Sequence, residues 1–240
     1  MVYPNLQFPK SKTRPFFYSN FVSTVDGKVQ ILKETKDYWP LGSKLDWETM
    51  QQLRSFADVL IHGKTTALSH PTLQSLSKDP YLSYRKESGK GDLTYVVISN
   101  HPGNDLIEFF KNPPPGVKPL IVTNEKAVIP KDLLASATIV QLGVETVDLQ
   151  KLSKLLKDEG AETVLVEGGP NLMGSFFQED LIDEVFLTIA PKIVGGEKGL
   201  TLTMAEGELL TPDKVKNLEL LSCQQVANEL YLRYKVTRAV

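Results

Sequence analysis

The strongest chemical signal in the sequence is the segment Glu167-Gly-Gly-Pro170, which combines a carboxylate, two glycines and a proline. It follows the apolar run Thr163-Val-Leu-Val166, which predicts a buried strand ending at the carboxylate. Glycines allow close approach of the backbone to a ligand, and a helix N-terminus offers free N–H groups to an anion. The segment could therefore bind a phosphate. Taken alone, an ordinary strand-to-helix turn is the better interpretation, because short glycine motifs are common.

A second candidate segment ends the run 20–28. Its strand leads into Thr24-Val-Asp-Gly-Lys28, so that a carboxylate (Asp26) and an ammonium (Lys28) follow the last strand residue. The alternative is a hairpin turn, because Asp-Gly is a strong turn signal. On this segment alone, the turn is again the better interpretation.

A third candidate is the run 54–66. Arg54 ends a predicted helix, and Gly63-Lys-Thr-Thr66 follows the next strand. These hydroxyl and amide groups could bind phosphate, but the glycine spacing of a P-loop is missing. The alternative is a helix-terminal arginine near its own carbonyls, followed by a polar loop.

The elements that would position these residues are short apolar strands alternating with helices. Predicted strands cover residues 16–24, 58–62, 94–99, 120–123, 138–142, 163–167, 184–190 and 229–236. Most are continuous apolar runs, as expected for strands buried on both faces. The pattern predicts an α/β fold with a mainly parallel central sheet, helices on both faces and an antiparallel C-terminal edge.

Three helices have recognisable signals. Ser43 and Asp46 resemble a capping box before one helix, and Asp148 can cap another that Gly160 would end. The third is predicted at 171–181, with Pro170 at its start. We expect a single domain over residues 1–240, with residues 1–14 as an N-terminal extension.

Composition excludes several classes of protein. The formal net charge of −2 and the pI near 6.0 argue against a nucleic-acid surface. No run approaches the roughly 20 apolar residues needed to span a bilayer, and residues 1–15 lack the apolar core of a secretory signal. We therefore expect a cytoplasmic protein without a membrane partner. Cys223 is the single cysteine and the three histidines lack metal-ligand spacing, so no metal is expected.

Taken together, the candidate segments resemble the reductase domain of riboflavin biosynthesis. The strongest match is Leu165-Val-Glu-Gly-Gly-Pro-Asn-Leu172, followed by Leu181-Ile-Asp-Glu-Val185 and Ile189-Ala-Pro-Lys-Ile-Val-Gly-Gly196. This composite is far more specific than any of its parts. The resemblance implies a dihydrofolate-reductase-like fold, a homodimer and NADPH as cofactor. It implies reduction of a 5-phosphoribosylamino-pyrimidine to its ribitylamino form.

The resemblance also assigns residues. The cofactor would contact Ser23, Trp39, Thr65, Ser69, Ser99, Gly168, Gly169, Pro170, Asn171, Leu172, Met173, Gly174 and Ser175. The substrate would contact Arg54, Asp37, Leu73 and Glu167. In the expected mechanism Glu167 orients the substrate, Arg54 pairs with its phosphate, and Asp26 or Lys28 completes the polar shell and supplies a proton.

The sequence departs from the family pattern in one loop. Ser69 stands where the family has a cofactor-contacting aspartate, and Ser75 and Leu76 stand near a position where an arginine often holds the phosphate. Arg85 could replace that arginine. Two alternatives therefore stay open: a reductase of the same fold acting on a pterin-like or small carbonyl substrate, and a non-catalytic nucleotide-binding protein.

Overall fold

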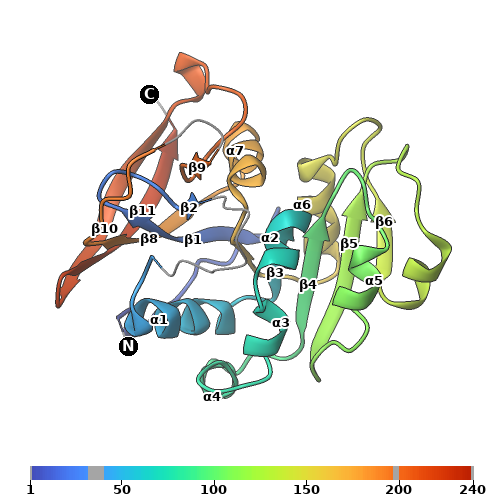
Figure 1. Cartoon of the computed structure of the whole chain (residues 1–240), viewed down its shortest axis with the longest axis horizontal. Coiled ribbons are helices and arrows are strands. Elements are labelled where there is room, and N and C mark those ends of the chain that lie inside the picture. The colour runs from blue at the N-terminus through green and yellow to red at the C-terminus, as the bar shows by residue number, and fades with distance from the viewer. Residues whose placement is uncertain (1, 32–40, 197–199, 239–240) are drawn as a thin grey trace. The chain divides into compact units, whose positions relative to one another are not determined.

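The computed structural model describes every residue except 1, 32–40, 197–199 and 239–240. The chain divides into two compact units, and it crosses between them several times (Figure 1). Unit 1 comprises Met1–Leu6, Phe17–Met50 and Gly169–Val240, and unit 2 comprises Gln7–Phe16 and Gln51–Gly168. The expectation of one domain over the whole chain stays a prediction.

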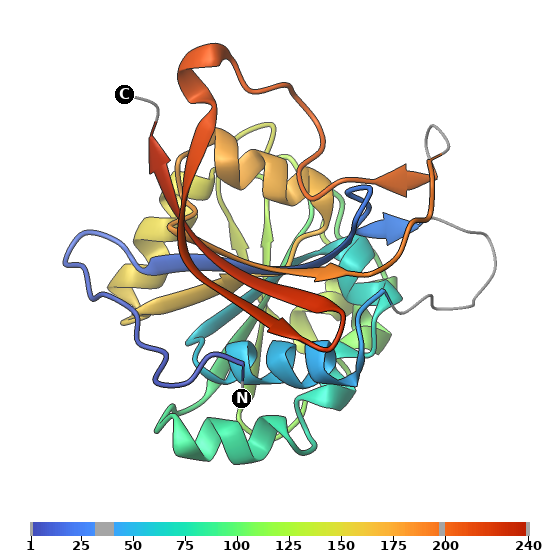
Figure 2. The ribbon, with the colours of Figure 1, turned by 90° about the vertical axis from the view of Figure 1, so that its left-hand side faces the viewer.

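Unit 1 contains four strands in the order β10-β11-β8-β1. They are β1 (Phe16–Thr24, whose first residue belongs to unit 2), β8 (Glu184–Ala190), β10 (Lys216–Val226) and β11 (Glu229–Arg238). β1 and β8 run parallel, whereas β11 is antiparallel to both β8 and β10. The long β10–β11 hairpin is the red ribbon of Figure 2. It confirms the antiparallel C-terminal edge, although β10 itself was missed.

Unit 1 also contains several shorter elements. They are β2 (Gln30–Ile31), β9 (Thr201–Leu202), the 3-10 turn η2 (Pro212–Lys214) and α7 (Pro170–Gln178), together with the first part of α1 (Lys44–Ser55). β2 and β9 form a separate two-stranded sheet. The N-terminal residues Val2, Tyr3 and Leu6 are buried, and the Tyr3 hydroxyl donates to the Leu232 carbonyl at 3.2 Å.

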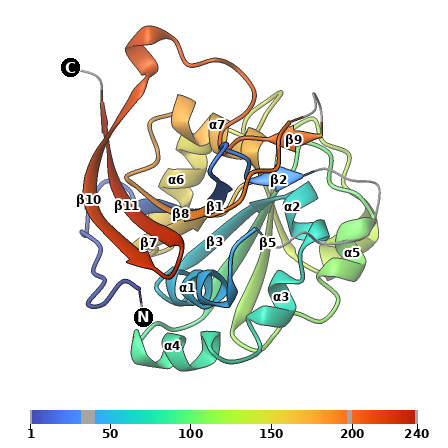
Figure 3. The ribbon, with the colours of Figure 1, turned by 60° about the vertical axis from the view of Figure 1, so that its left-hand side comes forward.

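Unit 2 contains five parallel strands in the order β7-β3-β4-β5-β6. They are β3 (Val59–Gly63), β4 (Leu93–Ile98), β5 (Val117–Thr123), β6 (Thr138–Gln141) and β7 (Thr163–Val166). Of these, β7, β3 and β5 are labelled in Figure 3. Almost every residue of β3, β4 and β7 is buried, as their continuous apolar runs predict. The mainly parallel sheet is thereby confirmed.

Helices cover both faces of the unit 2 sheet. They are α2 (Lys64–Ser69), α3 (Thr72–Ser75), α4 (Tyr81–Glu87), α5 (Asp105–Phe109), the 3-10 turn η1 (Lys131–Ala135) and α6 (Leu149–Asp158). The connections through α2 and α5 advance along the sheet from β3 to β5, whereas α6 returns the chain from β6 to β7. Right-handed crossovers therefore place α6 on the face opposite α2 and α5.

The Asp148 cap and the Ser43 half of the predicted capping box are confirmed, while the Ser43 N–H donates to Glu229. The Ser43 hydroxyl accepts hydrogen bonds from the N–H groups of Leu45 and Asp46 at the start of α1. The Asp148 carboxylate accepts one from Lys151 N–H at 2.9 Å at the start of α6. These bonds satisfy N–H groups that the first helical turn leaves without a partner. Among the residues that the structure describes, no helix combines the length and apolarity needed to cross a membrane.

Candidate active site

Glu167 is the first residue after β7, and its side chain is only 6% exposed. Its carboxylate accepts hydrogen bonds from Arg54 Nη2 at 2.6 Å and from Arg54 Nε at 3.0 Å. Burial alone would raise the pKa of Glu167. The Arg54 charge and the hydrogen bonds from His62 and Arg54 outweigh it and lower that pKa to about 2. Glu167 is therefore ionised at neutral pH, which suits an orienting group rather than an acid.

Arg54 lies in the last turn of α1 and is 4% exposed. Its guanidinium donates hydrogen bonds to Glu167. Its Nη1 also donates to the hydroxyl of Ser75, at the end of α3, at 3.0 Å. The Ser75 hydroxyl in turn donates to the Thr72 carbonyl at 2.7 Å. Arg54 thus links α3, which also carries Leu73, to the end of β7. Its expected role on a substrate phosphate stays a prediction.

His62 belongs to the same cluster, and the sequence analysis missed it. Its Nε2 lies 3.0 Å from Glu167 Oε2, and its Nδ1 lies 2.6 Å from the Tyr95 hydroxyl. An isolated histidine in an apolar strand resembles any other core residue. The pairing of the strands reveals its role. Ile61 of β3 pairs with Val166 of β7, so the residues that follow them, His62 and Glu167, become neighbours.

Gly168 and Gly169 make the turn from β7 into α7. Gly168 has φ +84°, a left-handed conformation that residues with a Cβ rarely adopt. Its carbonyl accepts a hydrogen bond from Gly63 N–H at 2.6 Å, which fixes the turn against the end of β3. Gly169 is the N-cap and Pro170 occupies the first helical turn. The predicted strand, turn and helix are therefore confirmed.

The predicted cofactor residues of α7 divide between two faces. Asn171 and Ser175 are exposed and Leu172 is half-buried, whereas Pro170, Met173 and Gly174 are buried. The backbone of Glu206 covers the buried face: its N–H donates to the Pro170 carbonyl, and a Cβ added to Gly174 would lie 2.1 Å from its carbonyl oxygen. Among the described residues of unit 1, the exposed side chains of α7 are Asn171 and Ser175, so this face of the helix is open to a ligand.

Asp26, Lys28 and Ser23 lie in unit 1, where β1 ends. The segment forms a turn, in which Gly27 N–H donates to the Thr24 carbonyl and Lys28 N–H donates to the Thr24 hydroxyl. It is not a hairpin, because β1 pairs with β8 and β2 pairs with β9. Asp26 accepts hydrogen bonds from the N–H groups of Val194 and Gly195. The hydrogen bond from the Thr24 hydroxyl, assisted by these two, lowers the pKa of Asp26. Ser23 is buried and donates to the Thr24 carbonyl.

The remaining predicted cofactor residues lie at or beyond the carboxyl ends of unit 2 strands. Thr65 is exposed in the first turn of α2, directly after β3, and Ser69 is exposed at the end of α2. Ser99 directly follows β4 and accepts a hydrogen bond from His101 N–H. Lys64 connects the two strand ends, since its Nζ donates to the His101 carbonyl at 3.2 Å and pairs with Asp105 at 2.9 Å. Ligands of α/β sheets bind at this edge. Asp37 and Trp39 lie outside the described residues.

Comparison with known proteins identifies the family. The sequence matches the RibD C-terminal domain over residues 15–232. This chain belongs to the RibD C-terminal domain family.

Several relatives extend over the whole domain. A 2,5-diamino-6-ribosylamino-4(3H)-pyrimidinone 5′-phosphate reductase of Methanothermobacter thermautotrophicus is 27% identical over 233 residues, covering 93% of this chain and 99% of that protein. The protein of the same name from Aquifex aeolicus is 28% identical over 214 residues, covering 85% of this chain and 88% of that protein.

Solved structures share the fold. A pyrimidine reductase-like protein of Corynebacterium diphtheriae superposes with a TM-score of 0.72 at 20% identity, covering 99% of this chain and 98% of that one. RibD of Acinetobacter baumannii gives 0.71 at 17% identity, and the match covers 94% of this chain but 59% of that longer protein.

Arg85 of this RibD-type domain does not replace the phosphate-binding arginine. It is 8% exposed, and its guanidinium donates to the backbone carbonyls of Ser55, Ala57, Gly91 and Asp92. All of these acceptors are backbone groups near the end of α1 and the start of β4. Arg85 is therefore a structural residue.

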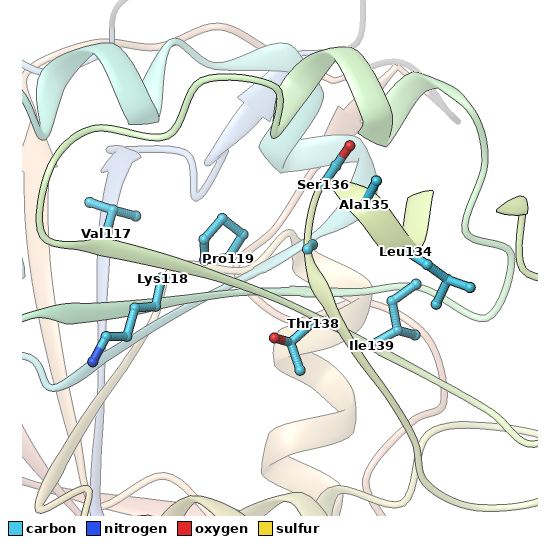
Figure 4. Close-up of a pocket in the computed structure, with 9 residues that line it drawn as sticks. Val117, Lys118, Pro119, Leu134, Ala135, Ser136, Thr138 and Ile139 are labelled. Atoms are coloured by element: carbon cyan, nitrogen blue, oxygen red, sulfur yellow. The ribbon is translucent and has the colours of Figure 1, made fainter. Parts of the chain in front are cut away.

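Unit 2 also has a cavity of about 580 Å³, shown in Figure 4. It is lined by Val117, Lys118, Pro119, Leu134, Ala135, Ser136, Ala137, Thr138 and Ile139, from β5, η1 and β6. Lys118, its one charged residue, pairs with Asp92. Because no predicted site residue lines it, the candidate active site is the Glu167 cluster and not this cavity.

Proposed function

We propose that this RibD-type domain is a cytoplasmic, NADPH-dependent reductase that converts a 5-phosphoribosylamino-pyrimidine into its ribitylamino form in riboflavin biosynthesis. The names of its relatives and the family membership support this function. The single observation that carries it is the buried Glu167–Arg54 pair, placed directly before the Gly168–Gly169 turn. An ionised carboxylate and a glycine turn at a helix N-terminus are thus adjacent in the chain.

The residues present fit a dinucleotide cofactor. Gly168, with its positive φ, places backbone without a side chain directly before α7. The first turn of that helix leaves the N–H groups of Asn171 and Leu172 without partners inside the helix. Asn171 and Ser175 present the open face of α7. Gly168–Ser175 would hold the pyrophosphate. Contacts of Thr65 and Ser99 with the cofactor stay predictions of the family resemblance.

The position of Lys64 supports NADPH rather than NADH as the cofactor. The two cofactors differ by a 2′-phosphate, which a nearby cation recognises. Lys64 is 25% exposed and lies at the ligand-binding edge of the unit 2 sheet, between Thr65 and the segment that carries Ser99. We assign it to the 2′-phosphate.

The reaction breaks the bond between ribose C1 and the ring oxygen, forms a C1–H bond with the hydride of NADPH, and adds a proton to the released oxygen. The bound cofactor supplies the hydride. Glu167 orients the substrate through its ionised carboxylate, which Arg54 stabilises. Of the two proton-donor candidates, Lys28 fits better, because its ammonium offers N–H donors while the lowered pKa of Asp26 keeps that carboxyl ionised.

The proposal is tested by following NADPH absorbance at 340 nm with the deaminated and the non-deaminated phosphoribosylaminopyrimidine, each in turn. Formation of the ribityl product together with NADPH oxidation supports the function, and the faster substrate defines the order of deamination and reduction. Binding of NADPH without turnover of either pyrimidine would contradict it.

A reductase acting on an unphosphorylated substrate is the second candidate. The observation that favours it is Arg85, whose donors are all directed to backbone carbonyls, so that it cannot replace the family arginine. Equal turnover of the phosphorylated and dephosphorylated pyrimidines would support this candidate.

We further propose a homodimer formed through the β10–β11 hairpin. In the antiparallel register, Leu218 and Leu220 pair with Val236 and Tyr234, and side chains of paired residues share one face. On the same face, Leu230 and Leu232 pair with Ile189 and Leu187 of β8. Leu218, Leu220 and Leu230 are 38% to 52% exposed. A contiguous, partly exposed apolar face of this kind favours association with a second copy.

A further inference from the structure

His62 is a buried polar residue that the proposed reaction does not yet use. Its side chain is 2% exposed and lies between two hydrogen-bond partners, Tyr95 and Glu167. Tyr95 is itself fully buried in β4. Among the described residues, the cluster thus forms one chain of contacts from Tyr95 through His62 to Glu167 and on to Arg54.

The chemistry of the partners determines where the protons lie. Glu167 is ionised and can only accept, so His62 Nε2 must carry a hydrogen and donate it. Nδ1 of a neutral imidazole is then an acceptor, and the Tyr95 hydroxyl donates to it at 2.6 Å. If Nδ1 carried the hydrogen instead, Nε2 and the carboxylate would be two acceptors 3.0 Å apart.

The groups facing His62 are Glu167 after β7, Arg54 from α1, Tyr95 from β4 and, at longer range, His70 after α2. Arg54 and His70 favour the neutral form of His62, whereas Glu167 opposes it. Burial lowers the pKa of His62, and this outweighs the opposite effect of Glu167. Arg54 already balances the carboxylate charge, so a second cation in this buried cluster would be unpaired.

The bonds are shared unequally between the two carboxylate oxygens. Oε2 accepts from Arg54 Nη2, Arg54 Nε and His62 Nε2, whereas Oε1 accepts from Arg54 Nε alone in the described part of the chain. A carboxylate oxygen has two lone-pair sites. Oε1 therefore keeps capacity for one more donor, such as an N–H or O–H group of a ligand.

We propose that His62 is a positioning residue: it holds Oε2 of Glu167 so that Oε1 faces the substrate, and Tyr95 supports this contact by donating to Nδ1 of the imidazole. The catalytic effect rests on the function proposed above. The tautomer itself does not, because it follows from the contacts of the folded protein alone.

The kinetic test compares three variants. His62→Phe keeps the ring and removes both hydrogen bonds, His62→Gln retains an amide donor, and Tyr95→Phe removes only the hydroxyl. We expect His62→Phe to lower kcat/KM for the pyrimidine about tenfold or more while the Kd for NADPH stays within about twofold. His62→Gln should recover most of the loss. The acid limb of the pH profile should move to higher pH in His62→Phe, because Glu167 loses a donor.

A second measurement does not depend on activity. Long-range ¹H–¹⁵N NMR of histidine-labelled protein reports the tautomer of each of the three histidines, and the His62 signal is the one that remains in both His70→Gln and His101→Gln. We expect the Nε2–H tautomer in the wild type and also in Tyr95→Phe, because Glu167 remains an acceptor for Nε2 in both.

The outcomes separate the two proposals. An inactive wild type that shows the Nε2–H tautomer contradicts the proposed function and leaves the positioning contact supported. A wild type with the Nδ1–H tautomer, or a folded His62→Phe variant with unchanged kcat/KM and pH profile, overturns the inference. If His62→Phe fails to fold, the NMR result and kcat/KM of Tyr95→Phe decide whether the inference holds. We expect kcat/KM of Tyr95→Phe to fall as well.

Discussion

Glu167 and Arg54 illustrate how a buried charge is retained at the end of a strand. Each side chain is about 5% exposed, and the two groups form a bidentate pair 2.6 to 3.0 Å apart. Removing one partner from such a pair leaves an uncompensated buried charge, which is strongly destabilising. The pair therefore constrains mutagenesis: conservative, near-isosteric changes are the informative ones.

Glu167→Gln should lower kcat/KM for the pyrimidine by more than about tenfold, or about 1.4 kcal/mol of transition-state stabilisation. The amide has the same shape but lacks the charge that orients the substrate. Steady-state kinetics at neutral pH measure the loss, with circular dichroism to verify the fold. Unchanged kcat/KM in a folded variant would exclude this role for Glu167.

The same residue predicts a dependence of stability on pH. The pKa of Glu167 falls from its ordinary 4.5 to about 2 on folding, so its ionised form stabilises the folded state. That contribution, about 3 kcal/mol, is complete above pH 5 and is lost as the pH falls through 2. In urea unfolding, the free energy of unfolding of the wild type should therefore exceed that of Glu167→Gln at pH 5, and this difference should disappear between pH 5 and 2. A constant difference would contradict the prediction.

Lys64→Gln tests the cofactor assignment. We expect KM for NADPH to rise about three- to tenfold while KM for NADH is unchanged, because only NADPH carries the 2′-phosphate. Asp105→Asn is the matched control: it removes the competing partner of Lys64, and KM for NADPH should hold or fall. Equal effects on both cofactors would place the 2′-phosphate elsewhere.

At the scale of elements, α7 depends on close packing against residues 203–207. A Cβ at Gly174 would lie 2.1 Å from the Glu206 carbonyl oxygen, so one backbone must move. Gly174→Ala should destabilise the domain by about 1–3 kcal/mol and weaken cofactor binding by shifting the first turn of α7. Gly91→Ala is the control, because a Cβ there meets nothing within 4 Å. Chemical denaturation of both variants measures the difference, and equal stabilities would contradict the packing argument.

At the scale of the whole molecule, the β10–β11 hairpin is the interface of the proposed dimer. Leu220→Glu puts a charge in the centre of the apolar face, where Leu220 is 52% exposed. We expect a dimeric wild type and a monomeric variant by light scattering coupled to size exclusion. Leu209→Glu, at a residue 93% exposed outside the hairpin, should remain dimeric. A monomeric wild type would refute the proposed dimer.

Much of the architecture follows from local patterns. The continuous apolar runs of β3, β4 and β7 required helices on both faces, and the strands at 16–24 and 184–190 match the structure to the residue. Ser43 and Asp148 capped their helices because side-chain oxygens satisfy N–H groups a few residues away. The strand, Gly168–Gly169 turn and helix α7 were readable for the same reason: each depends on neighbours in sequence.

What the sequence by itself determined was therefore the alternation of strands and helices and the turn before α7. The choice of Glu167 and Arg54 as site residues came from the family resemblance and stays a prediction. Only the tertiary structure decided which groups those residues meet. His62 joins Glu167 through the register of β3 with β7, 105 residues apart in the chain, and Arg85 turns to backbone carbonyls instead of a ligand. β10 was missed because both its faces are exposed, so that no burial pattern marks it. Hydrogen bonds between distant residues depend on packing, and packing leaves no periodic signal in the sequence.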